Sequence, residues 1–90
     1  DGQALVQRWL GALVDHDAAH QTDLVRTLEV FLANQRSWQR TAAAMSVHRQ
    51  TVLYRVRKIE ELTGTRLSET ADIAHLWLAL ETRNLLDGKA

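Results

Sequence analysis

Apolar residues recur at helical spacing along most of the chain, in five segments separated by short polar stretches. Apolar side chains three or four positions apart lie on one face of an α-helix. The chain contains no proline and only four glycines, so few residues would interrupt such helices. A length of 90 residues suffices for one small core. The pattern therefore predicts an all-α, five-helix domain that occupies residues 1–90.

The limits of these helices follow from the apolar segments and from the residues between them. We expect helices over about residues 3–14, 23–33, 38–45, 49–62 and 69–86, with residues 15–20 as a connector. Thr22 and Ser37 are candidate N-caps, and Gly64 suits a left-handed C-cap. The fifth helix has a predicted apolar set of Ile73, Leu76, Trp77, Leu80 and Leu85. Its tryptophan, like Trp9 and Trp38, is expected to pack in the core rather than to stack on bases.

The third and fourth predicted helices, within about residues 38–62, have the order and lengths of a helix-turn-helix. Ala42 and Ala43 supply the small side chains needed where two such helices cross. Ser46 stands in the turn at a position that requires an unusual backbone conformation, where glycine is common. Val47 is expected to enter the core. The buried stripe of the second helix is predicted to consist of Val52, Val56 and Ile59.

The face opposite that stripe carries side chains able to read DNA. With Val52 set at zero on a helical wheel, Gln50, Tyr54 and Arg57 fall between about 140° and 200°. Arginine can fork onto guanine and glutamine onto adenine in the major groove. Arg49 is the first residue of the predicted helix, and recognition helices enter the groove by their N-terminal end. Arg55 lies to one side, where it would contact either a phosphate or an acid of a neighbouring helix.

The balanced net charge conceals an uneven distribution. The chain has eleven basic and eleven acidic residues, yet the stretch from Val30 to Ile59 holds six basic residues and no Asp or Glu. A basic middle between acidic ends points to a polyanion that meets one face only. Two alternatives remain at this stage: a solvated arginine-rich helix, and a helical protein-interaction or dimerisation module without DNA binding.

Other chemistries find little support in the sequence. There is no cysteine for a disulfide, a thiolate metal site or a cysteine nucleophile. No apolar run approaches a membrane span, and no signal peptide is visible. No glycine-rich phosphate loop, nucleophile elbow or paired carboxylates are apparent, so we expect neither an enzyme nor a cofactor. His16 and His20 have metal-ligand spacing, but in a polar connector we expect solvated side chains and no metal site.

The stretch Val-His-Arg-Gln-Thr-Val-Leu-Tyr-Arg-Val-Arg-Lys-Ile-Glu-Glu-Leu-Thr-Gly, residues 47–64, resembles a known family. It is similar to the C-terminal helix-turn-helix domain of PucR-type and CdaR-type bacterial transcription regulators, and to the helix-turn-helix of the Fis nucleoid protein. The family pattern is roughly His-Arg-Asn-Thr-x-x-Tyr-Arg, then Ile-Glu-x-Leu-Thr-Gly. Gln50 replaces the usual Asn, which keeps the amide but puts the base preference in doubt. The similarity extends over nearly the whole chain.

The resemblance implies a Fis-like DNA-binding output domain that follows an N-terminal sensory region, absent here, in a longer cytoplasmic regulator. The recognition helix, about residues 49–62, would lie in the major groove of a double-stranded promoter or operator. We expect the full-length protein to be a homodimer. Arg49, Gln50 and Thr51 stand where the family's Arg-Asn-Thr contacts DNA. The complete candidate set for DNA binding is Arg40, His48, Arg49, Gln50, Thr51, Tyr54, Arg55, Arg57 and Lys58.

Overall fold

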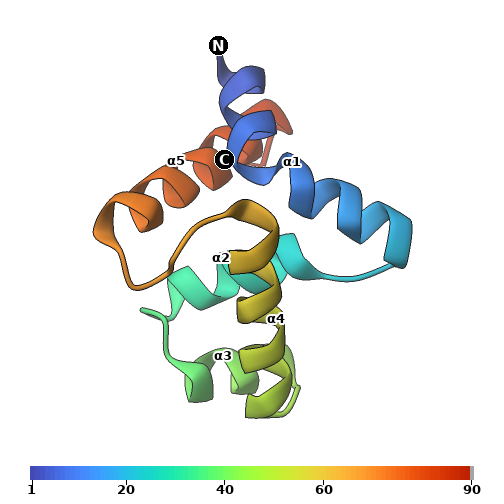
Figure 1. Cartoon of the computed structure of the whole chain (residues 1–90), viewed down its shortest axis with the longest axis vertical. Helices are drawn as coiled ribbons and strands as arrows, with labels where there is room; N and C mark the ends of the chain where they lie inside the picture. Colours follow the sequence, from blue (N-terminus) through green and yellow to red (C-terminus); the bar gives the residue numbers. More distant parts are fainter. Residues whose placement is uncertain (90) are drawn as a thin grey trace.

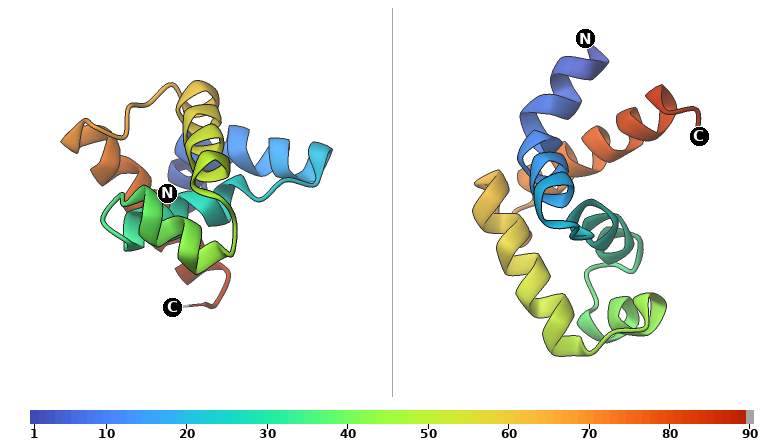
Figure 2. Two further views of the ribbon diagram at one scale, coloured as in Figure 1. Left: turned by 90° about the horizontal axis from the view of Figure 1, so that it is seen from below. Right: turned by 90° about the vertical axis from the view of Figure 1, so that its right-hand side faces the viewer.

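The computed structural model describes residues 1–89, which form five α-helices and, within that range, no strand. The all-α, five-helix prediction is confirmed. α1 and α5 pack together at one end of the molecule, α3 and the start of α4 form the other end, and α2 lies between them (Figures 1 and 2). The helices are α1 (Gly2–His20), α2 (Leu24–Ala33), α3 (Trp38–Met45), α4 (Arg49–Thr63) and α5 (Thr70–Leu86).

All five helices contribute to one hydrophobic core. Full burial of one large aliphatic or aromatic side chain favours folding by about 1.5–3 kcal/mol, so this shared core holds the short helices together. Val47 is half-buried and packs against the core. Ala42 is buried as predicted, but Ala43 is exposed, so one small residue suffices where α3 meets its neighbours. The most deeply buried side chains include Leu10, Leu13, Leu28, Phe31, Val52, Ile59 and Leu76.

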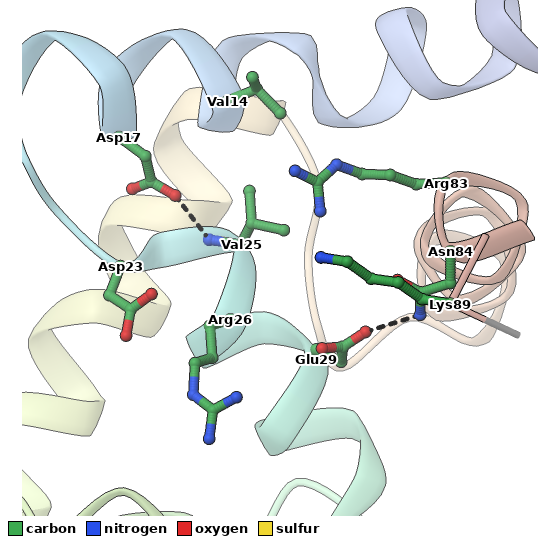
Figure 3. Close-up of a pocket in the computed structure, with 9 residues that line it drawn as sticks. All are labelled: Val14, Asp17, Asp23, Val25, Arg26, Glu29, Arg83, Asn84 and Lys89. Carbon is green, nitrogen blue, oxygen red and sulfur yellow. Dashed lines mark hydrogen bonds between the residues drawn. The ribbon is translucent and has the colours of Figure 1, made fainter. Parts of the chain in front are cut away.

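The predicted connector at residues 15–20 is wrong, because α1 continues to His20 and ends at Gln21 in the left-handed conformation. The polar end of α1 carries a side chain that organises the start of α2. Asp17 accepts hydrogen bonds from the backbone N–H groups of Leu24 (2.8 Å) and Val25 (3.0 Å), the second of which is drawn in Figure 3. Thr22, the predicted cap, instead donates its hydroxyl to Asp17. A carboxylate from α1 therefore caps α2.

The tryptophans are less buried than predicted. Trp77 is 47% exposed and Trp38 38% exposed, whereas Trp9 is half-buried and stacks on the exposed His75 with ring centroids 4.4 Å apart. Leu85, predicted as apolar core, is 64% exposed. α5 has apolar residues on its outer as well as its inner face, so periodicity alone could not identify the buried set. The residues of α5 that are buried are Leu76, Ala79 and Leu80.

α5 is also joined to α2 by a hydrogen bond from the Asn84 side-chain amide to Glu29 (2.9 Å). This contact borders an open pocket between α1, α2 and α5 (Figure 3). Both acidic and basic side chains line the pocket, and none of them comes from α3 or α4. Within residues 1–89, no helix is long and apolar enough to cross a membrane. The same range holds no cluster of three or more His, Asp or Glu side chains suited to a metal ion, and His16 instead hydrogen-bonds Thr22.

The cap supplied by Asp17 leads to a stability prediction. Loss of a helix cap costs about 0.5–2 kcal/mol, and Asp17 serves two N–H groups at once. We therefore expect Asp17→Ala to lower the free energy of unfolding by about 1–2 kcal/mol, measured by urea denaturation with circular dichroism. Asp15→Ala, which removes an exposed carboxylate from the same helix, is the control and should change stability by less than about 0.5 kcal/mol. Equal losses in both variants would contradict the capping role.

Two buried threonines form a matched pair for a second prediction. Thr27 donates its hydroxyl to the carbonyl oxygen of Asp23 (2.7 Å), whereas the buried hydroxyl of Thr41 has no hydrogen-bond partner in the described part of the chain. An unsatisfied buried polar group costs about 1–3 kcal/mol. Thr41→Val should therefore raise the melting temperature, and Thr27→Val should lower it. A fall in both variants would show that the Thr41 hydroxyl is satisfied in solution.

Candidate nucleic-acid interface

The local sequence fixes both ends of α3 and thereby the point where α4 begins. The Ser37 hydroxyl accepts the backbone N–H of Arg40 at 3.1 Å, so the predicted N-cap is confirmed. α3 ends at Ser46, which adopts the left-handed conformation (φ 57°, ψ 44°), also as predicted. The N–H of Val47 then bonds back to the carbonyl oxygen of Ala42 at 3.0 Å. This tight turn directs the chain away from α3 and into α4.

Buried side chains fix the rotation of α4 about its own axis. Val52, Val56 and Ile59 point into the core, as the periodicity predicted. The helix continues to Thr63 and ends at Gly64 in the left-handed conformation (φ 68°), which confirms the predicted C-cap. With this stripe buried, the opposite side of α4 must face solvent.

The solvent-facing side of α4 is the face expected from the helical wheel. Gln50, Tyr54 and Arg57 are all exposed, Tyr54 by 69%. His48 and Arg49 are exposed at the start of the helix, and Thr51 and Lys58 are half-buried beside it. Arg40 is exposed on α3, the neighbouring helix of the motif. Eight of the nine candidate residues thus lie on or directly before α4, and the ninth, Arg40, lies on the helix packed against it. The part of the protein that carries these nine residues is called the candidate surface below.

Two cations of this surface already have partners within the domain. The guanidinium of Arg55 donates to the Thr27 hydroxyl of α2 at 3.4 Å, so its partner within the domain is a hydroxyl and not an acid. Lys58 lies 3.4 Å from Glu61, which is largely exposed. An ion pair at the surface contributes at most about 1 kcal/mol, so a phosphate can compete with Glu61 for Lys58. Arg55 therefore ties α4 to α2, while Lys58 is available to an anion.

The acidic residues of α4 itself lie at its far end. Glu60 accepts the backbone N–H of Leu67 at 2.8 Å and holds the loop that follows α4. Glu61 is one position further along. The first turns of α4 carry arginines and no carboxylate, and an α-helix adds partial positive charge at its N-terminus. The leading end of α4 is therefore the part best suited to an anionic partner.

The structure adds residues to this surface that sequence reasoning missed. Trp38, from the start of α3, lines a groove together with Arg49, Gln50 and Leu53. Arg36 lines an adjoining groove together with Arg57 and Glu60, and it donates to the carbonyl oxygen of Leu67 at 3.1 Å. On the other side of α4, a third groove is shared with residues from the end of α1 and the start of α2: His16, Gln21, Thr22, Asp23 and Leu24. The only sequence signal for Arg36 was its place in the stretch from Val30 to Ile59, which holds no Asp or Glu. Nothing in the sequence showed that the other residues would lie beside α4 in the fold.

Comparison with known proteins places the helix-turn-helix in a family. The family model of the PucR C-terminal helix-turn-helix domain matches residues 24–82. The transcriptional activator PmfR of Paenarthrobacter nicotinovorans is 44% identical over 81 residues, which cover 90% of this chain and 17% of that protein. The purine catabolism regulatory protein of Bacillus subtilis is 40% identical over 63 residues, 70% of this chain and 12% of that protein.

A third relative is the proline-responsive transcriptional activator PutR of Bacillus subtilis, 32% identical over 71 residues, or 79% of this chain and 17% of that protein. The chain thus spans less than a fifth of the length of each of these three relatives. No solved structure matches it significantly. The similarity to the two activators extends beyond the two helices of the motif to most of the domain.

Proposed function

The chain belongs to the PucR C-terminal helix-turn-helix domain family and is thus a DNA-binding domain, and on that premise we propose that it is the output domain of a longer bacterial transcription regulator. In this proposal α4 enters the major groove of a double-stranded operator and reads its sequence. The domain acts by binding alone and has no catalytic role. Because its target is bacterial DNA, the regulator works in the cytoplasm.

The observation that carries this proposal is the outward face of α4. A polar, arginine-rich face is held outward by a buried stripe on the same helix, and it is free of acids over its first turns. An α-helix with its side chains is about 10–12 Å wide, which matches the width of about 12 Å of the major groove. A merely solvated helix would not need this separation of arginines from carboxylates.

The leading end of α4 would read bases. Arg49 can donate two hydrogen bonds to O6 and N7 of a guanine, and Gln50 can pair with N6 and N7 of an adenine. Tyr54 and Arg57 follow on the same face, about one and two turns further along. We assign base readout first to Arg49 and Gln50, because recognition helices insert by their N-terminal residues.

The flanks of the face would hold the phosphate backbone. Lys58 on α4 and Arg40 on α3 are basic side chains on different helices of the motif. His48 and the hydroxyl of Thr51 lie near the N-terminus of α4, where backbone N–H groups also favour phosphate. Arg55 has further N–H groups beyond the one that donates to Thr27. Such contacts set the register of a protein on DNA without reading sequence.

Two substitutions separate these roles. Arg49→Ala should weaken binding to an operator sequence by about 1–3 kcal/mol and relax the preference at one base pair. Lys58→Ala should weaken binding to all duplexes alike and reduce the salt slope by about one unit. The measurement is fluorescence anisotropy across a salt series, with duplexes enriched from a random pool by this domain and with the unselected pool.

Arg8→Ala is the charge-matched control, because Arg8 lies on the first half of α1, far along the chain from the motif, and packs over Trp9. It should leave the binding of selected duplexes nearly unchanged. An equal loss on every sequence for Arg49→Ala would make Arg49 a phosphate contact only. If the unmodified domain bound no duplex even at low salt, the DNA-reading function itself would be contradicted.

The full-length regulator is proposed to act as a homodimer. Four large apolar side chains are exposed on α5, away from the helix-turn-helix, which leaves that helix available for protein contacts: Trp77, Leu78, Leu85 and Leu86. A two-fold dimer predicts operator half-sites about 34 Å apart. Sedimentation equilibrium of the longer protein should then give twice the protomer mass, and deletion of one half-site should sharply reduce its affinity. A monomeric mass together with full affinity for a single half-site would contradict the dimer.

A further inference from the structure

The groove between the start of α3 and the first two turns of α4 differs in character from the rest of the DNA-facing surface. Two of its four lining side chains, Trp38 and Leu53, are apolar, and the other two are the proposed base readers Arg49 and Gln50. Trp38 is 38% exposed although it is a large aromatic residue, and Leu53 is half-buried. An apolar groove therefore opens directly beside the polar groups that would meet base edges.

The shape of this groove is held by the fold. The ring of Trp38 packs against Phe31 of the core, with ring centroids 5.0 Å apart and the planes tilted by 40°. Ser37 caps α3 and fixes the start of the helix on which Trp38 stands. Leu53 follows directly after Val52, which is fully buried, so the backbone position of Leu53 is also fixed. The two apolar walls thus have defined positions before any ligand arrives.

Thymine is the base that presents a methyl group, at its C5 position, on the major-groove edge. The groove is continuous with the proposed base-reading surface, because Arg49 and Gln50 belong to both. We propose that Trp38 and Leu53 receive the methyl group of a thymine adjacent to the base pairs read by Arg49 and Gln50, and so determine specificity for T at that position. This inference rests on the proposed DNA-reading function, which it refines.

The methyl group itself can be removed without changing base pairing. In a selected duplex, each thymine is replaced in turn by deoxyuridine, which keeps every hydrogen-bonding group and lacks only the methyl. Binding of the unmodified domain is measured by anisotropy at one salt concentration. We expect a three- to five-fold loss of affinity at one thymine of the site, the size of effect expected for one buried methyl group. The other thymines should show changes below two-fold.

Substitutions then connect that thymine to the groove. In the Leu53→Ala variant, deoxyuridine at that thymine should reduce affinity by less than two-fold, because the leucine side chain that contacts the methyl group is then missing. Trp38→Phe is the second variant; it retains an aromatic ring against Phe31 and should give a partial reduction. Leu5→Ala, which truncates a half-buried leucine on α1, is the matched control and should leave the deoxyuridine effect unchanged.

The outcomes of this experiment are separable. If selected duplexes bind tightly but no deoxyuridine substitution weakens them, the inference is overturned while the DNA-reading function stands. An undiminished deoxyuridine effect in both Leu53→Ala and Trp38→Phe would also overturn it, since the methyl would then lie elsewhere. If no duplex is selected at all, the proposed function fails first. Circular dichroism of each variant shows whether it is folded, and the scan with the unmodified domain depends on no variant.

Discussion

Burial of Val52, Val56 and Ile59 fixes the rotation of α4 about its own axis, and every feature of the candidate interface depends on that rotation. Successive residues of an α-helix are about 100° apart, so a slip of one residue would turn Tyr54 or Arg57 toward the core and expose apolar groups. Such a slip is opposed from both ends. The left-handed turn at Ser46 sets where the helix begins, and Gly64 sets where it ends. Few contacts thus determine which side chains face a partner.

The other helices hold the helix-turn-helix of α3 and α4 in place. Asp17 from α1 caps α2, Arg55 from α4 donates to Thr27 on α2, and Asn84 from α5 donates to Glu29 on α2. α2 is therefore bonded to three of its neighbours through polar side chains in addition to the shared core. The family match likewise extends beyond the two helices that would meet DNA and includes all of α2.

The parts of the structure that were predictable from sequence are those with local signals. Ser37, Ser46 and Gly64 each mark a boundary by their own side chain or backbone preference, and α3 and α4 were accordingly predicted almost to the residue. The errors arose from non-local contacts. The cap of α2 comes from Asp17, seven residues before Leu24. Trp77 matched helical spacing, yet an apolar pattern on both faces of α5 cannot show which face is buried. The groove at Trp38 exists only because α3 folds back against α4.

The most direct test of the central claim is to map which residues meet DNA. Amide chemical shifts of the ¹⁵N-labelled domain are recorded by NMR during titration with a selected duplex and, separately, with a random one. If the outward face of α4 reads DNA, the largest chemical-shift changes should occur at residues 48–58 and at the indole N–H of Trp38. Little change is then expected along the exposed side of α5. Shifts concentrated on α5, with the amides of Arg49, Gln50 and Tyr54 unmoved, would contradict it.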